Sequence, residues 1–208
     1  MGFYQKIFAN QYDKFMSSIE TEFAPIRHSL ISDLKGQILD VGCGTGVNFE
    51  YFNQKANVIA VEPSPYMLDK AKQKLLKNNT IIKAKIETYN LSITDEKLNK
   101  IIKPKSLDYI VSTLVLCTIP DYNLALQKFH SWLKDDGKLI ILEHIHAKEK
   151  TRRIIQNIIN PAWKIIGDGC HLNRDTDKVI QSSGFMPLND AYFKRTLRFY
   201  KGIFVKNK

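Results

Sequence analysis

The residues best suited to chemistry in this chain lie in a glycine-rich loop near its start. Residues 37–41 form a mostly apolar segment that predicts a buried strand, and Gly42, Gly44 and Gly46 follow it. Glycines at the carboxyl end of a strand let the backbone approach a ligand closely. The spacing G-x-G-x-G differs from the dinucleotide fingerprint G-x-G-x-x-G, because Val47 stands where the third glycine would be. The loop therefore predicts a nucleotide site in which phosphate is not the obvious ligand.

Two acidic residues narrow the choice of ligand. Glu62 ends the next predicted strand, 57–62, at the distance after Gly42 where an α/β sheet presents a carboxylate to ribose hydroxyls. Asp40 precedes the glycines, where its charge would repel a pyrophosphate but would suit an amino group or a sulfonium. S-adenosylmethionine fits all three features, so it is the expected cofactor.

At these residues the chain resembles the class I S-adenosylmethionine-dependent methyltransferases, whose first motif is similar to the D-V-G-C-G-T-G of residues 40–46. The resemblance implies that Met67 lies under the adenine, with simple core packing as the alternative, and that Glu87 lies at the adenine end of the pocket. It also implies a cap over the cofactor, because residues 12–16 resemble the Y-D-x-x-M piece of the family's cap, although amphipathic packing explains them equally well. The expected cofactor-binding residues are Asp40, Gly42, Cys43, Gly44, Gly46, Asn48, Glu62, Pro63, Ser64, Met67, Glu87, Ser112, Thr113 and Leu114.

Strand and helix signals alternate along the chain. Strands are expected at 37–41, 57–62, 80–86, 107–116 and 138–143. Helices are expected at 48–54, from Pro65 with Ser64 as N-cap, at 95–102, and at 121–133 before a glycine turn at 136–137. Two closing strands, 186–193 and 197–205, resemble the family's terminal antiparallel hairpin. The pattern predicts an α/β fold with a doubly wound, mostly parallel, seven-stranded sheet, the Rossmann-like methyltransferase fold.

The domain organisation follows from the same signals. The length of 208 residues predicts one domain, and no repeat or low-complexity linker divides it. We expect an N-terminal helical cap over residues 1–34 and a methyltransferase domain over 35–208. A helical insert on the substrate side is expected at about 148–184, the least generic region of the chain.

The composition of the chain limits which binding partners and which cellular compartment are expected. The net charge of +10 suits nucleic acid or an anionic membrane, but the lysines are spread out and no aromatic-interleaved RNA-binding motif appears. No nucleic acid is therefore expected, while peripheral membrane contact stays open. Cys43, Cys117 and Cys170 lie far apart in the sequence without a C-x-x-C pair, and the histidines lack metal-like clustering except for His144 and His146, which alternate at a predicted strand end. We expect no metal and a reducing, cytoplasmic setting; the oligomeric state is not predicted.

A narrower resemblance concerns the acceptor. The S-T-L-V-L-C of 112–117, the E-H of 143–144 and the N-P-A-W and D-G-C-H-L-N-R of 160–174 are similar to the microsomal thiol S-methyltransferases and their bacterial relatives. The chain departs from that pattern at Ser112, where cysteine is usual. It also shows no long hydrophobic N-terminal anchor, so stable membrane residence is not expected.

The resemblance implies a small-molecule acceptor, with a thiol sulfur preferred. Methyl transfer from a sulfonium is an in-line displacement, so the protein supplies alignment, a dry pocket and help in forming the thiolate. His144 and His171 are the candidate bases, with Asp168 as an orienting group; for each histidine a purely structural hydrogen bond is the alternative.

Three other functions are alternatives to this one. Methylation of a phospholipid amine or a quinone-type carbon uses the same chemistry, and the basic segment near Arg152 could sit on an anionic surface. A non-catalytic cofactor-binding or interaction protein is disfavoured, because the glycine loop and both acids are intact. A nicotinamide dehydrogenase is disfavoured by the missing third glycine and by Asp40.

Overall fold

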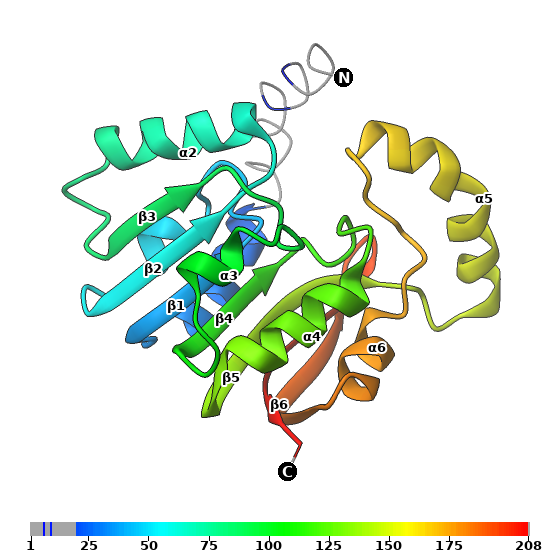
Figure 1. Cartoon of the computed structure of the whole chain (residues 1–208). Coiled ribbons are helices and arrows are strands. Elements are labelled where there is room, and N and C mark those ends of the chain that lie inside the picture. Colours follow the sequence, from blue (N-terminus) through cyan, green and yellow to red (C-terminus); the bar gives the residue numbers. More distant parts are fainter. Residues whose placement is uncertain (1–5, 7–8, 10–19, 208) are drawn as a thin grey trace. The chain divides into compact units, whose positions relative to one another are not determined.

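The computed structural model describes residues 6, 9 and 20–207, and Figure 1 shows the succession of its helices and strands. This part of the chain forms two compact units. The first runs to Ile102 and includes Leu107–Val111, and the second comprises Lys103–Ser106 and the chain from Ser112 onwards.

The first unit is built on three parallel strands, β1 (Gly36–Val41), β2 (Ala56–Val61) and β3 (Lys85–Tyr89). Its other elements are a helix over residues 20–31, the 3-10 turn η1 (Phe49–Tyr51), α2 (Pro65–Lys77), α3 (Leu98–Ile101) and the start of β4 (Leu107–Thr113). Ile38 and Leu39 of β1 are fully buried, and each such side chain stabilises the fold by about 2 kcal/mol. The buried strand β1 thus fixes the point at which the glycine loop begins.

Helix α2 begins where the sequence predicts. The Ser64 hydroxyl accepts a hydrogen bond from the Met67 N–H at 3.4 Å, and Pro65 occupies the first turn, where no N–H is required. Met67 and Leu68 of this helix are buried. Leu76 is 78% exposed, because it lies about 100° further round the helix than Leu75.

The second unit is built on three antiparallel strands, β5 (Leu133–Ile145), β7 (Arg198–Lys206) and β6 (Phe185–Lys194). Its helices are α4 (Tyr122–Trp132), α5 (Lys150–Ile166) and α6 (Thr176–Ser182). The four residues Leu139–Leu142 of β5 are fully buried, as expected for a central strand that is covered on both faces. The end of β5 carries Glu143 and His144, which the sequence singled out.

The strands form one seven-stranded mixed sheet in the order β3-β2-β1-β4-β5-β7-β6. The order runs outwards from β1 to β3 and then resumes at β4 in the other direction, which is the doubly wound pattern. The predicted fold class is therefore confirmed, including its antiparallel C-terminal hairpin.

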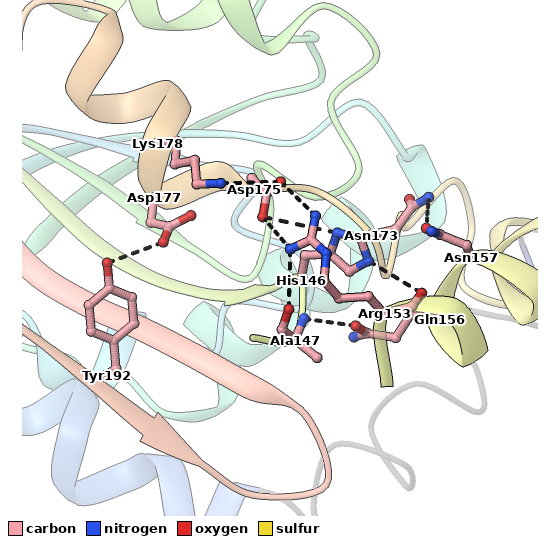
Figure 2. A network of polar contacts seen from close by, with 10 residues as sticks. All are labelled: His146, Ala147, Arg153, Gln156, Asn157, Asn173, Asp175, Asp177, Lys178 and Tyr192. Carbon is pink, nitrogen blue, oxygen red and sulfur yellow. Dashed lines mark hydrogen bonds and ion pairs between the residues drawn. The ribbon is translucent and has the colours of Figure 1, made fainter. Parts of the chain in front are cut away.

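Helix α5 is attached to the second unit through polar contacts (Figure 2). Arg153 forms a bidentate pair with Asp175, with both N···O distances at 3.1 Å. The Gln156 side chain accepts a hydrogen bond from the Ala147 N–H at 2.8 Å, and His146 Nδ1 lies 4.0 Å from Asp175. These contacts join the start of α5 to the end of β5 and to the segment that precedes α6.

The opposite face of α5 is apolar and faces solvent. The buried residues of α5 are the polar Gln156 and Asn160, which lie on the other side of the helix. Asn160 accepts a hydrogen bond from the Leu172 N–H at 2.8 Å. Six isoleucines are between 44% and 72% exposed: Ile154, Ile155, Ile158, Ile159, Ile165 and Ile166. We call this set the isoleucine face. Among the described residues no helix is long and apolar enough to cross a membrane.

Two predicted elements of the first unit differ from the structure. The helix expected at 48–54 is only the 3-10 turn η1, because the backbone is already extended at Phe52, with φ −69° and ψ 137°. The strand expected at 80–86 lies at Lys85–Tyr89 instead. Ile81, which suggested a buried strand, is 56% exposed.

Three further predictions were wrong in extent. The strand expected at 107–116 ends at Thr113, because Leu114 adopts a left-handed conformation with φ 58°. The helix expected at 95–102 is limited to α3, Leu98–Ile101. The turn expected at 136–137 lies inside β5, because Leu133 is already extended and α4 passes directly into the strand.

Candidate functional site

The glycine loop of the first unit has a left-handed backbone at its three glycines. Gly42, Gly44 and Gly46 have φ of 58°, 56° and 79°, a region that side chains disfavour. A Cβ at Gly46 would lie 2.6 Å from the ring of Phe49, so this position has no room for a side chain. The Cys43 N–H donates to the Val61 carbonyl at 3.0 Å, which fastens the loop to the end of β2.

Glu62 directly follows β2 and is buried, with 8% of its surface exposed. One carboxylate oxygen accepts from the Gly44 N–H at 3.0 Å, and the other accepts from the Ser64 N–H at 2.8 Å. The acid thus ties the glycine loop to the start of α2. Its predicted role at the ribose hydroxyls stays a prediction.

Asp40 is fully buried at the end of β1 and belongs to a chain of polar side chains. Its Oδ1 accepts from Asn48 at 2.8 Å, and the Asn48 carbonyl oxygen accepts from Arg27 at 2.7 Å. Asp40 Oδ2 is buried without a hydrogen-bond partner among the described residues. Burial raises the pKa of Asp40 to about 7, against the lowering effects of Asn48 and Arg27.

The unpartnered oxygen of Asp40 is the observation that tests the cofactor's fit. A buried carboxylate oxygen without a donor costs free energy, and a cationic amino or sulfonium group would satisfy it. A phosphate would add a second negative charge beside it. The residues of this loop therefore fit S-adenosylmethionine.

Other expected cofactor residues lie around the start of α2. Met67 is 6% exposed, and its methyl carbon lies 3.6 Å from where a Cβ of Gly44 would be, so the side chain borders the glycine loop. Pro63 is exposed in the preceding turn. Asn90, which the sequence did not single out, donates to the carbonyls of Glu62 and Pro63 at 2.9 and 3.0 Å.

Glu87 does not occupy the predicted position at the end of a strand. It lies in the middle of β3 in register with Ile59, and it is exposed. Its carboxylate contacts Lys85 at 3.5 Å and accepts from the Tyr89 hydroxyl at 3.0 Å. The strand was predicted at 80–86 but lies at 85–89, so Glu87 falls inside it and not after it. Its predicted role at the adenine end of the pocket stays a prediction. The residue that follows the observed strand is Asn90.

In the second unit, a buried carboxylate fixes the turn that follows β4. Glu143 Oε1 accepts hydrogen bonds from the Ser112 hydroxyl at 3.2 Å and from the Val115 and Leu116 N–H groups at 2.9 Å. Burial raises the pKa of Glu143 above its usual value. The N–H of Leu114, which lies between Ser112 and Val115, donates to the Leu142 carbonyl at 2.7 Å. The segment 112–114 is therefore rigidly held, whereas its contact with the cofactor stays a prediction.

His144 lies in a cluster with two cysteines. Its Nε2 is 3.1 Å from the sulfur of Cys170, which in turn is 3.6 Å from the sulfur of Cys117. The hydrogen bond between the sulfurs lowers the pKa of Cys170 and raises that of Cys117. His144 Nδ1 is buried and unpartnered among the described residues. His144 is thus paired with sulfur and not with Asp168.

His171 is held by the backbone of the loop after β4. Its N–H and its Nδ1 both lie within hydrogen-bond distance of the Cys117 carbonyl, at 3.0 and 3.1 Å. Burial, and then the charge of Arg174, lower the pKa of His171. Asp168 is half-buried with φ 47°, and burial raises its pKa. Neither histidine is oriented by Asp168 in this structure.

Three hydrogen bonds of Arg27 and Arg174 could not be predicted from the sequence, because they join segments that are distant along the chain. Arg27 is 2% exposed and completes the chain to Asp40, but nothing in its local sequence distinguishes it from a surface arginine. Arg174 donates to the carbonyls of Leu116 and Ile119, which fixes the segment after His171.

Residues 12–16, on which the cap prediction rests, lie outside the described residues.

Comparisons with known proteins agree with this geometry. The profile of the methyltransferase-domain family matches residues 8–176. The chain is 31% identical over 183 residues to the thiol S-methyltransferase TMT1B of Rattus norvegicus, covering 85% of this chain and 71% of that protein. It is 27% identical over 188 residues to the human thiol S-methyltransferase TMT1A, covering 89% and 75%.

A solved structure shares the fold. The 1,6-didemethyltoxoflavin-N1-methyltransferase of Burkholderia thailandensis superposes with a TM-score of 0.65 over 98% of this chain and 87% of that one, at 14% identity. Its likeness supports the fold, while the sequence matches define the family. The chain therefore belongs to the methyltransferase family, and the predicted enzyme class and cofactor, S-adenosylmethionine, are confirmed.

Proposed function

We propose that this enzyme methylates the sulfur of a small thiol. The observation that carries the proposal is the 31% identity with a thiol S-methyltransferase, which extends over 85% of the chain. A phospholipid amine or a quinone-type carbon is the alternative acceptor. No comparable similarity favours the non-catalytic alternative.

The first unit supplies the cofactor contacts in this proposal. S-adenosylmethionine, when bound, supplies an electrophilic methyl group on a sulfonium. Asp40 Oδ2 is a buried acceptor that needs a cationic partner, and the glycines that follow it let the backbone approach a ligand closely. Glu62 holds this loop in place and is our candidate for the ribose contact. Met67 borders the same loop and is our candidate for the adenine contact.

His171 is the candidate base for the acceptor. Because its Nδ1 faces the Cys117 carbonyl at 3.1 Å, the proton of the neutral ring belongs on Nδ1, which leaves the Nε2 lone pair free to accept a proton. His144 Nε2 is instead engaged by Cys170 at 3.1 Å. We therefore assign proton transfer to His171 and a positioning role to His144, with Asp168 as a candidate contact for the acceptor.

The test is an assay of methyl transfer to alkyl thiols, hydrogen sulfide, phosphatidylethanolamine and a quinol, with S-adenosylhomocysteine formation as readout. Methylation of thiols alone supports the proposal, and methylation of the lipid or the quinol alone rejects it. His171→Ala should lower turnover by about 100-fold while the dissociation constant for S-adenosylhomocysteine stays constant. Equal turnover of the variant and the parent would remove His171 from the mechanism.

We also infer that the second unit rests on an anionic lipid surface through the isoleucine face. Six exposed isoleucines on one side of α5, with exposed Lys150, Arg152 and Lys164 around them, match an amphipathic helix that lies in the membrane interface. Co-sedimentation with vesicles of phosphatidylserine and phosphatidylcholine tests this, and Ile158→Glu should abolish it. Ile81→Glu, at an exposed isoleucine of the first unit, is the control. Equal sedimentation of both variants and the parent contradicts the inference.

A further inference from the structure

Three potential metal ligands meet in the second unit, although the sequence separates them by up to 53 positions. Cys117 lies in the loop after β4, His144 near the end of β5, and Cys170 in the loop after α5. The ligand atoms of these residues all lie within 4.8 Å of one another. Cys117 and His144 are buried, at 2% and 6% exposure, whereas Cys170 is partly exposed and gives the cluster access to solvent.

The shortest distances in the cluster resemble the edges of a zinc tetrahedron. With Zn–S bonds of about 2.3 Å and Zn–N bonds of about 2.0 Å, two sulfurs on one ion lie about 3.8 Å apart, and a sulfur and a nitrogen about 3.5 Å apart. The observed sulfur–sulfur distance is 3.6 Å, and the distance from His144 Nε2 to the Cys170 sulfur is 3.1 Å. The third edge, between His144 and Cys117, is no longer than 4.8 Å.

The charge around the cluster suits a dication bound by two thiolates, because the sum of these three charges is zero. A neighbouring cation is Arg174, whose guanidinium donates to the carbonyls of Leu116 and Ile119 and stacks 4.7 Å from the ring of Tyr122. Those contacts direct its hydrogen-bond donors to the backbone. Within the described part of the chain no histidine, cysteine or carboxylate joins these three residues as a fourth ligand. A metal held here would keep one position for an exogenous ligand.

We propose that Cys117, His144 and Cys170 form a binding site for a thiophilic dication such as Zn²⁺, with the fourth coordination position available to an external thiol. The two cysteines bind as thiolates and release their protons to solvent, and no electron is transferred. A thiol in the fourth position likewise loses its proton and becomes a metal-bound thiolate, the nucleophilic form of sulfur. This last step rests on the proposed function, whereas the three-ligand site does not.

The experiment is titration of the full chain with Co²⁺ as a spectroscopic substitute for Zn²⁺. The protein is reduced with a phosphine, because thiol reductants would compete for the metal. We expect one Co²⁺ per chain, with sulfur-to-metal charge-transfer bands and the visible bands of a tetrahedral site. Addition of an alkyl thiol should shift the visible bands as it takes the fourth position. Competition with Zn²⁺ then gives the zinc affinity.

Three variants and one control make the result specific. Cys117→Ala, Cys170→Ala and His144→Gln should each weaken binding by more than about 100-fold, since each loses a ligand. Cys43→Ala removes the remaining cysteine, which lies in the first unit, and should bind Co²⁺ as the parent does. Binding of S-adenosylhomocysteine by the other three variants shows that they are folded, and circular dichroism shows it for Cys43→Ala, because Cys43 is an expected cofactor residue.

Two outcomes would overturn the proposal. One is the absence of stoichiometric Co²⁺ and Zn²⁺ binding by the reduced parent. This includes the case in which air oxidation joins Cys117 and Cys170 in a disulfide and subsequent reduction of that disulfide restores no metal binding. The other is equal binding by the parent and the cysteine variants. Metal binding without any thiol methylation would refute the proposed acceptor and leave the site intact. Thiol methylation by a protein that binds no metal would do the reverse.

Discussion

Replacement of Asp40 by asparagine should change how the stability of the enzyme depends on pH. Burial raises the pKa of Asp40 from 3.8 to about 7 in the folded state. Between these two values the folded chain holds one more proton at this site than the unfolded chain, so stability falls as pH rises. A difference of about 3 pKa units at about 1.4 kcal/mol each gives a loss of about 4 kcal/mol, complete above about pH 7.

The assay is urea unfolding of the parent and of Asp40→Asn at several values between about pH 5 and about pH 8. The asparagine carbonyl can still accept from Asn48, and it cannot ionise. Relative to the variant, the parent should therefore lose stability steadily up to about pH 7 and no further. Asp33→Asn, at an exposed position, controls for the change of net charge. A difference between parent and variant that is constant over this range would refute the burial argument.

The same substitution tests the cofactor contact. At about pH 8 the parent carries a buried carboxylate that a cationic ligand can pair with, so Asp40→Asn should weaken S-adenosylmethionine binding by more than about tenfold. Below about pH 7 Asp40 of the parent must release its proton before it can pair with the cationic cofactor. The affinity of the parent for S-adenosylmethionine should therefore fall by up to about tenfold for each unit by which the pH is lowered. The variant should show no such slope. Parallel slopes for both proteins would contradict the contact between Asp40 and the cofactor.

Three further outcomes are expected. Glu62→Ala frees the Gly44 and Ser64 N–H groups and should weaken cofactor binding by more than about tenfold in calorimetric titration; an unchanged dissociation constant would reject the assignment. Arg153→Lys breaks a bidentate, partly exposed pair and should lower the stability by about 1 kcal/mol in thermal unfolding, a loss that disappears when Asp175 is already alanine. Ile141→Ala, at a fully buried position, should destabilise by about 3 kcal/mol in urea, whereas Ile158→Ala, at 72% exposure, should cost less than about 0.5 kcal/mol; similar costs would contradict the observed burial.

The parts of the fold that the sequence predicted correctly have strong local signals. The strand before Gly42 is mostly apolar and has glycines at its end, and α2 has both a serine N-cap and a proline in its first turn. Such signals act within a few residues and need no information about distant partners. The third strand lacks them. Its sequence, K-I-E-T-Y, is no more apolar than the preceding segment, and its place depends on pairing with β2.

The candidate site divides in the same way. The motif of residues 40–46 identified the cofactor because spacing alone encodes a loop that approaches a ligand. The cluster around His144 could not be found by spacing, since its two cysteines come from loops on either side of β5 and α5. The expectation of no metal arose from this separation along the chain. Likewise, Arg27 gained its place at Asp40 only through the tertiary fold.

The pairing of β5 with β7 has a consequence for synthesis of the chain. Leu139–Leu142 form the most completely buried stretch of β5, and their partners lie at Lys201–Phe204, about sixty residues later. On the ribosome, this apolar strand therefore emerges well before the strand that pairs with it, and at synthesis rates of about 5–20 residues per second it waits for several seconds. During that time the segment is a target for chaperones or for association with other nascent chains. Chains that stop after α6 should accordingly aggregate, even though every residue of the glycine loop is present.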